Sequence, residues 1–288
     1  MEPLRTKSFQ LIHYGCDDKM MDATEVTDSL AVEAIGAGTG TIVIETDHGL
    51  CNRLRAVLSY WQVAQAGGNQ LVAVWKADDH CNGHFLECFA PLSGVRFIRQ
   101  PPSWCPAPEV VNNTHPDIGA LAEIEGYAHL IPTTALQAAV AARVLALGPF
   151  VAVHVRRTDL PVFMGAVFAA HGQTTNATFM AFLDRHHAHA VHIATCCAET
   201  HELFRATYNA RCVGVLPEFT PGKLRQTTLS DAVVDLFVCA SSEHFLGSYG
   251  SSFSETISHL RAHNRLERAS RAIDAIPQRR HQRGQTHV

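Results

Sequence analysis

The sequence predicts an α/β protein whose parallel sheets are divided between two domains. Short apolar runs rich in β-branched residues alternate with helical segments, which is the pattern of βαβ units in a parallel sheet. The length of 288 residues suits two domains of ordinary size better than one. Gly148 and Pro149 end an Ala- and Leu-rich helical segment and open a new unit, so we place the domain boundary near Gly148.

The first predicted domain, residues 1–148, contains short buried strands and two clear helices. Apolar residues recur at helical spacing over residues 51–66 until Gly67 and Gly68 end the helix, and residues 133–147 form the second helix. The predicted strands are residues 41–45, 71–75 and 95–98.

The second predicted domain, residues 149–262, shows the same alternation of strands and helices. Its predicted strands are residues 150–155, 191–195, 212–216 and 244–247. Its predicted helices are residues 198–208, 230–240 and 252–262. Residues 263–288 form a polar tail, which we expect to start as a helix and then fray.

Composition narrows the class of protein. Hydrophobic residues make up 47% of the chain and charged residues 17%, which is typical of a globular protein. The net charge of -4 leaves no broad basic field, so we expect no nucleic-acid partner. The sequence has no apolar run long enough to span a bilayer, and no apolar segment follows its basic first residues. We therefore expect a cytoplasmic or otherwise soluble protein without a transmembrane segment.

Cysteine and histidine spacing favours no metal site. The nine cysteines include no C-x-x-C pair, which argues against zinc-ribbon and thioredoxin-like proteins and favours reduced core thiols. The 18 histidines are scattered, and their one cluster, His186, His187 and His189, has no Cys or acid at matching spacing. We therefore expect exposed helix surface at this cluster, with metal binding as the minor alternative.

The segment HVRRTD, from His154 to Asp159, carries the strongest functional signal. It ends a predicted strand, and side chains alternate along a strand, so His154 and Arg156 share one face. Ligands of open parallel sheets bind at the carboxyl ends of strands, where a guanidinium can grip a phosphate and an imidazole can bond a base. The alternative is an ion-paired arginine beside a core histidine. Because burying two arginines is costly unless they are paired, we favour the functional interpretation.

The segment GSYGSSFSE, residues 247–255, joins a strand end to a helix start. Ser252 and Glu255 are three residues apart, which fits a helix capping box. Free amides and hydroxyls at a helix N-terminus also bind phosphate well. The small polar residues Ser248, Ser251 and Ser252 exceed what a cap needs, so we predict a phosphate site here.

Two weaker signals lie elsewhere in the chain. The segment GLCNRLR, residues 49–55, joins the first strand to its helix, and taken alone it fits an Asn52 helix cap beside a solvated Arg53. Asp235 is a polar residue in an apolar stretch of the predicted helix 230–240, so it needs a polar partner. The N–H groups of a guanine would supply one.

Taken in order, HVRRTD, the IAT of residues 193–195, the helix with Asp235, and GSYGSSFSE resemble the fucosyltransferase superfamily. That superfamily includes the α-1,6-fucosyltransferases, the nodulation fucosyltransferases and the protein O-fucosyltransferases. GLCNRLR is similar to its N-terminal glycine-asparagine loop, and the resemblance covers roughly residues 41–262. It implies two facing Rossmann-like domains of the glycosyltransferase B type, with the active site in the cleft between them.

The resemblance also implies the substrates and the roles of residues. The donor would be GDP-fucose, bound mostly by the C-terminal domain without a metal or other cofactor, and the acceptor a glycan or a protein. His154 and Asp235 would contact guanine, and Arg156 would bind the β-phosphate and stabilise the leaving group. The other donor-binding residues would be Arg157, Ser248, Ser251 and Ser252. The residues that would face the fucose and the acceptor from the other domain are Gly49, Asn52 and Arg53.

Three departures from the superfamily pattern bear on mechanism. The second glycine of the N-terminal loop is Cys51, and the acid of a strand-end ATD is replaced by Cys196. The glutamate assigned as base in the α-1,6 group falls near Met164, so Asp159 is the nearest substitute, unless it only orients the arginines before it. We expect a single inverting displacement, in which a carboxylate or a phosphate oxygen takes the acceptor proton. A transferase of the same fold with another sugar nucleotide, and an inactive module that binds glycans or nucleotides, stay open as alternatives.

Overall fold

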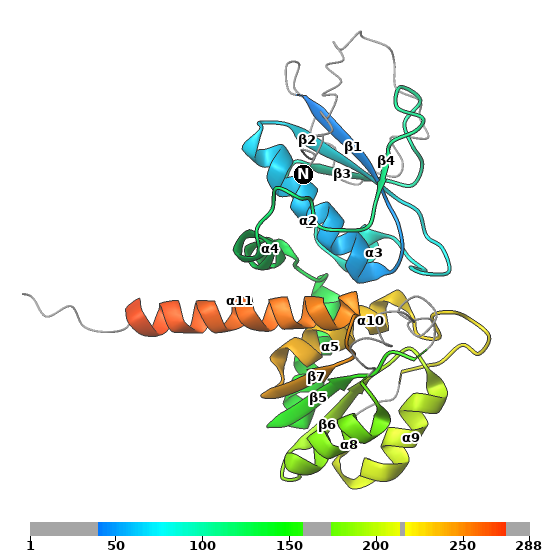
Figure 1. Cartoon of the computed structure of the whole chain (residues 1–288), viewed down its shortest axis with the longest axis vertical. Helices are drawn as coiled ribbons and strands as arrows, with labels where there is room; N and C mark the ends of the chain where they lie inside the picture. The colour runs from blue at the N-terminus through cyan, green and yellow to red at the C-terminus, as the bar shows by residue number, and fades with distance from the viewer. Residues whose placement is uncertain (1–39, 158–173, 214–216, 275–288) are drawn as a thin grey trace, which may run out of the picture.

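The computed structural model describes residues 40–157, 174–213 and 217–274. Within these ranges the chain forms two parallel sheets, each with its own helices, and the long helix α11 (Ser252–Asp274) runs between them (Figure 1). The α/β class with parallel sheets is confirmed. Each helix in these ranges is too short or too polar to cross a membrane.

The first sheet has four parallel strands in the order β3-β2-β1-β4. They are β1 (Thr41–Thr46), β2 (Gln70–Trp75), β3 (Val95–Ile98) and β4 (Glu109–Val111). The prediction misses β4, because its three residues are too short a run to give a periodic signal. The helices of this unit are α2 (Leu50–Ala66), which connects β1 to β2, α3 (Phe85–Cys88), α4 (Ala120–Gly126) and the short η1 (Tyr127–His129).

The second sheet has three parallel strands in the order β6-β5-β7. They are β5 (Phe150–His154), β6 (Ala190–Ala194) and β7 (His244–Gly247). The predicted strand at residues 212–216 is reduced, in the described residues, to one bridge between Cys212 and Val191. The helices around this sheet are α5 (Thr134–Leu147), α8 (Asn176–Arg185), α9 (Ala198–Tyr208), η2 (Asn209–Arg211) and α10 (Leu229–Ser241).

Two helices do not fit the domain boundaries that the sequence predicts. Helix α5 precedes Gly148 but packs on α10, beside the second sheet. Helix α11 runs to Asp274 and not to residue 262, because no glycine or proline interrupts residues 252–274. It contacts α2 and α4 of the first unit as well as α10 and β7 of the second (Figure 1). The division into residues 1–148, 149–262 and 263–288 therefore stays a prediction.

One apolar core joins the two units. Its buried residues extend from Ile44 and Leu54 in the first unit to Val238 in α10 and Ile257 in α11. A separate core covers the other face of the second sheet, where Val151 packs with side chains of α8 and α9. The continuous core holds the loops at the carboxyl ends of both sheets on opposite sides of one space.

Candidate functional site

A cavity of about 480 Å³ lies between the two sheets, a volume suited to a small ligand. Its walls come from the segments that follow the strands of both sheets. These lining segments are residues 48–52 after β1, 80–82 after β2, His154 and Arg156 at the end of β5, residues 194–196 at the end of β6 and 250–253 after β7. The cavity thus lies at the carboxyl ends of parallel strands, where ligands of open α/β sheets bind.

His154 is buried at the end of β5 and lines the cavity. Its Nδ1 lies 2.8 Å from the hydroxyl of Ser254, and its ring stacks on Phe253 with 4.5 Å between centroids. Burial, and then the nearby charges of Arg156 and Arg225, lower the pKa of His154 to about 3. The imidazole is therefore neutral at physiological pH and can form hydrogen bonds without carrying charge.

A glycine permits the contact between His154 and helix α11. A Cβ on Gly247 would lie 2.5 Å from the side chain of Ser254, which is closer than real Cβ atoms approach. The last residue of β7 must therefore be glycine for α11 to pack this close. The sequence pattern indicates the serines of the turn but not Ser254, whose hydroxyl contacts the imidazole of His154.

Arg156 follows β5, and its side chain lines the cavity. Its backbone N–H donates to the hydroxyl of Ser248 over 2.9 Å, and that hydroxyl donates to the carbonyl of His154 over 3.1 Å. Ser248 is buried and is not among the lining residues. Contrary to the expectation of a donor-binding hydroxyl, Ser248 ties the end of β5 to the loop after β7 and so positions Arg156.

Arg157 is not among the residues that line the cavity. Its guanidinium donates to the side-chain oxygen of Asn176, at 2.8 Å from Nη2, and to the carbonyl of Thr174 at 2.9 Å. It also lies over the ring of Phe179, and burial lowers the pKa of Arg157. The expected donor contact is therefore corrected, since Arg157 fastens the start of α8. The sequence contains a signal for this difference between Arg156 and Arg157, because neighbouring residues of an extended chain face opposite sides.

The serine turn joins β7 to α11, as predicted, and supplies Ser251 and Ser252 to the cavity. Gly250, with φ of +72°, makes the turn into α11, which begins at Ser252. The predicted capping box is replaced by another arrangement. The backbone N–H of Glu255 donates to the carbonyl of Ser251, and the carboxylate of Glu255 pairs with Arg55 across the cavity at 3.2 Å.

Asp235 lies on α10 and lines the cavity. Its polar partner within the protein is His192 on β6, whose Nε2 lies 3.0 Å from Oδ1 of Asp235. The His192 side chain is only 4% exposed and that of Asp235 14%. The sequence predicted that Asp235 needs a partner but did not identify His192, because nothing in an apolar strand indicates which helix covers it.

The opposite wall begins at Gly49, the N-cap of α2. Asn52 also lines the cavity, and its side-chain oxygen accepts a hydrogen bond of 3.0 Å from Arg55. Cys51, which replaces a superfamily glycine, lies between them, and burial raises the pKa of its thiol to about 12. The thiol therefore stays protonated, so Cys51 offers a ligand a neutral group beside the Asn52 amide.

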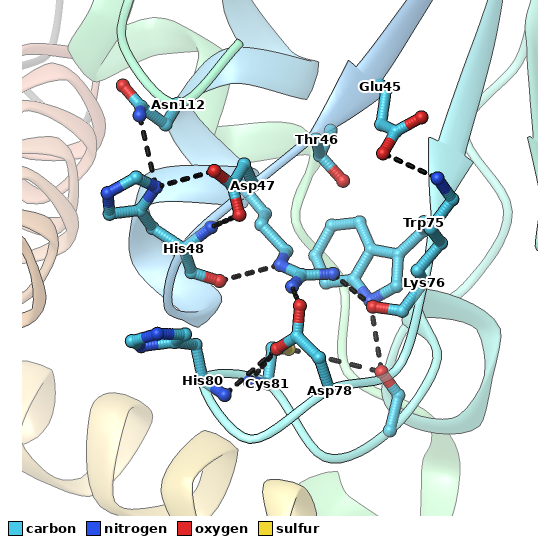
Figure 2. A network of polar contacts seen from close by, with 12 residues as sticks. Glu45, Thr46, Asp47, His48, Trp75, Lys76, Asp78, His80, Cys81 and Asn112 are labelled. Carbon is cyan, nitrogen blue, oxygen red and sulfur yellow. Dashed lines mark hydrogen bonds and ion pairs between the residues drawn. The ribbon is translucent and has the colours of Figure 1, made fainter. Parts of the chain in front are cut away.

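Arg53 contradicts the expectation that it faces the sugar and the acceptor. Its side chain has 0% exposure and is not among the lining residues. It donates to the carbonyls of His48 and Lys76 and to the carboxylate of Asp78, which converge beside the ring of Trp75 (Figure 2). Arg53 is thus neither solvated nor part of the cavity, and it fastens the loop after β1 to the loop after β2.

Several lining residues carry no signal that the sequence analysis detected. The loop before α10 contributes Arg225, Thr227 and Thr228, and the loop after β2 contributes His80. These loops are irregular, so periodicity says nothing about them. Asp159, predicted as a catalytic residue, lies outside the described residues.

The predicted histidine cluster lies at the other end of the second sheet. His186 is the C-cap of α8, so the cluster falls in the turn after that helix and not on the helix surface. His189, Glu243 and His244 bring one possible metal-ligand atom each within 4.8 Å of the others. They stand before β6 and at the start of β7, whereas the cavity lies at the carboxyl ends of these strands.

These features define a class of fold: two parallel α/β units with one cavity at the carboxyl ends of their strands. Within that class, solved structures of fucosyltransferases are similar to this chain, which has a fucosyltransferase-like fold. The chain is 16% identical to the α-1,6-fucosyltransferase NodZ soaked with GDP-fucose, with a TM-score of 0.51 over 76% of this chain and 92% of NodZ. Other NodZ crystals are described as coming from Bradyrhizobium.

The structure of POFUT1 is also similar. The apo form is 12% identical, with a TM-score of 0.56 over 81% of this chain and 98% of POFUT1. POFUT1 in complex with GDP-fucose gives a TM-score of 0.56 at 12% identity, over 78% of this chain and 95% of that one. Neither a scan of protein-family models nor a search of curated protein sequences found a match. At these identities the likeness establishes the fold.

Proposed function

We propose that this protein is a glycosyltransferase that transfers fucose from GDP-fucose to a glycan or protein acceptor. The observation that carries the proposal is the cavity. It brings His154, Arg156, Ser251 and Ser252 together on one wall, and Gly49 with Asn52 on the other. Structures of the same fold contain GDP or GDP-fucose, which supports a nucleotide sugar as the ligand.

On the donor wall, the base and the phosphates of GDP would have chemically suitable partners. The Arg156 guanidinium can grip the β-phosphate with two hydrogen bonds, and the start of α11 with Ser251 and Ser252 can hold the diphosphate. The neutral His154 imidazole can bond the guanine, and the Asp235 carboxylate can accept its N–H groups. His192 would hold the Asp235 carboxylate in place.

The proposed reaction is a single inverting displacement at the anomeric carbon of fucose. Arg156 and the positive end of α11 would neutralise the diphosphate as it departs, so the reaction would need no metal ion. Holding donor and acceptor between two walls would supply the orientation. Asn52 and Gly49 would face the fucose, with the acceptor on the same side.

The test is a panel of nucleotide sugars, with and without EDTA, in which hydrolysis and transfer to glycan and peptide acceptors are followed by mass spectrometry. We expect GDP-fucose to be consumed in preference to GDP-mannose and UDP sugars, at the same rate in EDTA. Turnover of a UDP sugar alone would indicate another transferase of this fold. Activity that EDTA abolishes and manganese restores would contradict the metal-independent mechanism, and GDP binding without turnover would indicate an inactive module.

A further inference from the structure

His48 is a cavity-lining residue in an unusual backbone conformation. It follows β1 and has φ of +66°. Among the described residues, His48 alone has a positive φ without being glycine. Residues other than glycine rarely adopt this left-handed backbone conformation, and those that are held in it tend to cluster at functional sites. The strained residue lies on the wall that carries Asn52, across the cavity from Arg156.

Three residues fix His48 in place. Asp47 accepts the His48 backbone N–H at 2.6 Å, and Arg53 donates to the His48 carbonyl at 2.7 Å. The ring Nδ1 lies 3.1 Å from a carboxylate oxygen of Asp47 and 3.1 Å from the side-chain amide of Asn112. Figure 2 shows both contacts on one ring nitrogen, while the other nitrogen points away from Asp47 and Asn112.

The Asp47 carboxylate favours one tautomer of the ring. Burial alone would raise the pKa of Asp47, but the hydrogen bond from the His48 backbone and the charges of His48 and Arg53 outweigh it and lower the pKa. An ionised carboxylate at Nδ1 holds the proton there, which leaves Nε2 with a free electron pair. The Asn112 amide would then present its oxygen to the ring, an orientation equally compatible with its position.

We propose that His48 is the general base of the transfer reaction and that Asp47 is its positioning residue; this rests on the proposed function. Inversion requires the acceptor oxygen to attack from the side opposite the departing diphosphate, and His48 lies on that side. As the acceptor oxygen bonds to the anomeric carbon, its proton passes to Nε2 of His48. The bond from that carbon to the phosphate oxygen breaks, GDP keeps the electron pair, and the imidazolium later releases its proton to water.

Three other titratable groups of the cavity, Asp235, Glu255 and His154, are less suited to this role. Asp235 is bonded to His192, and Glu255 is paired with Arg55. His154 has a pKa of about 3, so it is a weak base, and it belongs to the donor wall. His80 stacks against His48 with 6.1 Å between ring centroids. The charged or titratable side chains around His48 are those of His80, Asp47 and Arg53.

The experiment compares His48→Gly with the wild type, because glycine accepts positive φ without strain. We expect turnover of GDP-fucose to fall at least about 100-fold while GDP affinity stays within about threefold, and added imidazole to restore part of the rate. The acidic limb of the wild-type pH–rate profile should be lost in the variant. His187→Gly removes an exposed histidine far from the cavity and controls for the effect of imidazole itself.

Asp47→Asn tests the positioning role, since it should lower turnover and shift the acidic limb with little change in GDP affinity. Asp159→Asn compares the alternative base in the same assay. The inference would be overturned if His48→Gly kept the turnover of the wild type, or if Asp159→Asn were the one variant that removed the acidic limb. Either result would leave the proposed function intact. A wild-type protein that consumes no GDP sugar would overturn both. If the glycine variant unfolds, His48→Asn, which tolerates positive φ, replaces it in the rescue experiment.

Discussion

The segment behind each wall of the cavity contains two arginines close together in sequence, and in each pair the two have different environments. On the first wall, Arg53 is fully buried, whereas Arg55 lines the cavity and pairs with Glu255. On the second wall, Arg157 fastens α8, whereas Arg156 lines the cavity. Each of the two basic motifs therefore contains one arginine that fastens a loop or helix and one that lines the cavity.

Backbone geometry explains the division. Residues two apart on a helix face nearly opposite sides, as do neighbouring residues of extended chain. Arg53 and Arg55 stand two apart in α2, and Arg156 directly precedes Arg157 after β5. A basic motif thus does not imply that all its charges bind ligand. The following predictions separate loop-building arginines from cavity-lining ones.

The largest effect on stability is expected for Arg53→Met. It removes the donors of two backbone carbonyls and the cation beside Asp78, so the free energy of unfolding should fall by on the order of 3 kcal/mol. Urea denaturation followed by circular dichroism measures it. An unchanged denaturation midpoint would mean that this network contributes nothing to folding.

Arg156→Lys should act on the reaction instead. Lysine keeps the charge but loses the planar fork that grips a phosphate, so turnover should fall about 100-fold or more, equivalent to about 2.7 kcal/mol. The midpoint of urea denaturation should stay near that of the wild type. Arg157→Lys is the matched control, and its turnover should fall less than about tenfold. Near-normal turnover in folded Arg156→Lys would make Arg156 another structural arginine.

Burial of the neutral His154 should make the free energy of unfolding depend on pH, with an effect smaller than those of Arg53→Met and Arg156→Lys. The pKa of His154 in the folded protein, about 3, is below the ordinary 6.5, so the unfolded chain takes up the proton first as pH falls. Stability is therefore lost below about pH 6.5, by about 1 kcal/mol between pH 7 and 5.5 from this residue. His154→Gln should remove this part of the pH dependence, measured by urea denaturation at the two pH values. Parallel curves for wild type and variant would contradict a buried neutral imidazole.

The smallest effect is expected for the Arg55–Glu255 pair, which joins the two walls. Its side chains are 21% and 53% exposed, so water screens the interaction, and Arg55→Met should cost less than about 1 kcal/mol. A double-mutant cycle with Glu255→Gln measures the coupling. A coupling as large as the effect of Arg53→Met would show that the cavity depends on this pair to stay assembled.

Local pattern predicted most of the secondary structure and part of the site. The apolar strands β1, β2, β3, β5, β6 and β7 and the placement of His154, Arg156, Ser251 and Ser252 follow from alternation and from strand ends. Long-range packing decides the rest. The partner of Asp235, the burial of Arg53 and the extension of α11 depend on elements far away in the chain, and no short segment encodes those contacts.

The most direct test of the central claim is calorimetric titration of the wild-type protein with GDP, UDP and ADP in EDTA. We predict that GDP binds at least about tenfold more tightly than UDP or ADP, because in the proposed complex His154 and Asp235 contact the base and Arg156 the β-phosphate. Equal affinity for the three diphosphates would contradict recognition of guanine. Binding of none of them would contradict the assignment of the cavity to a nucleotide sugar.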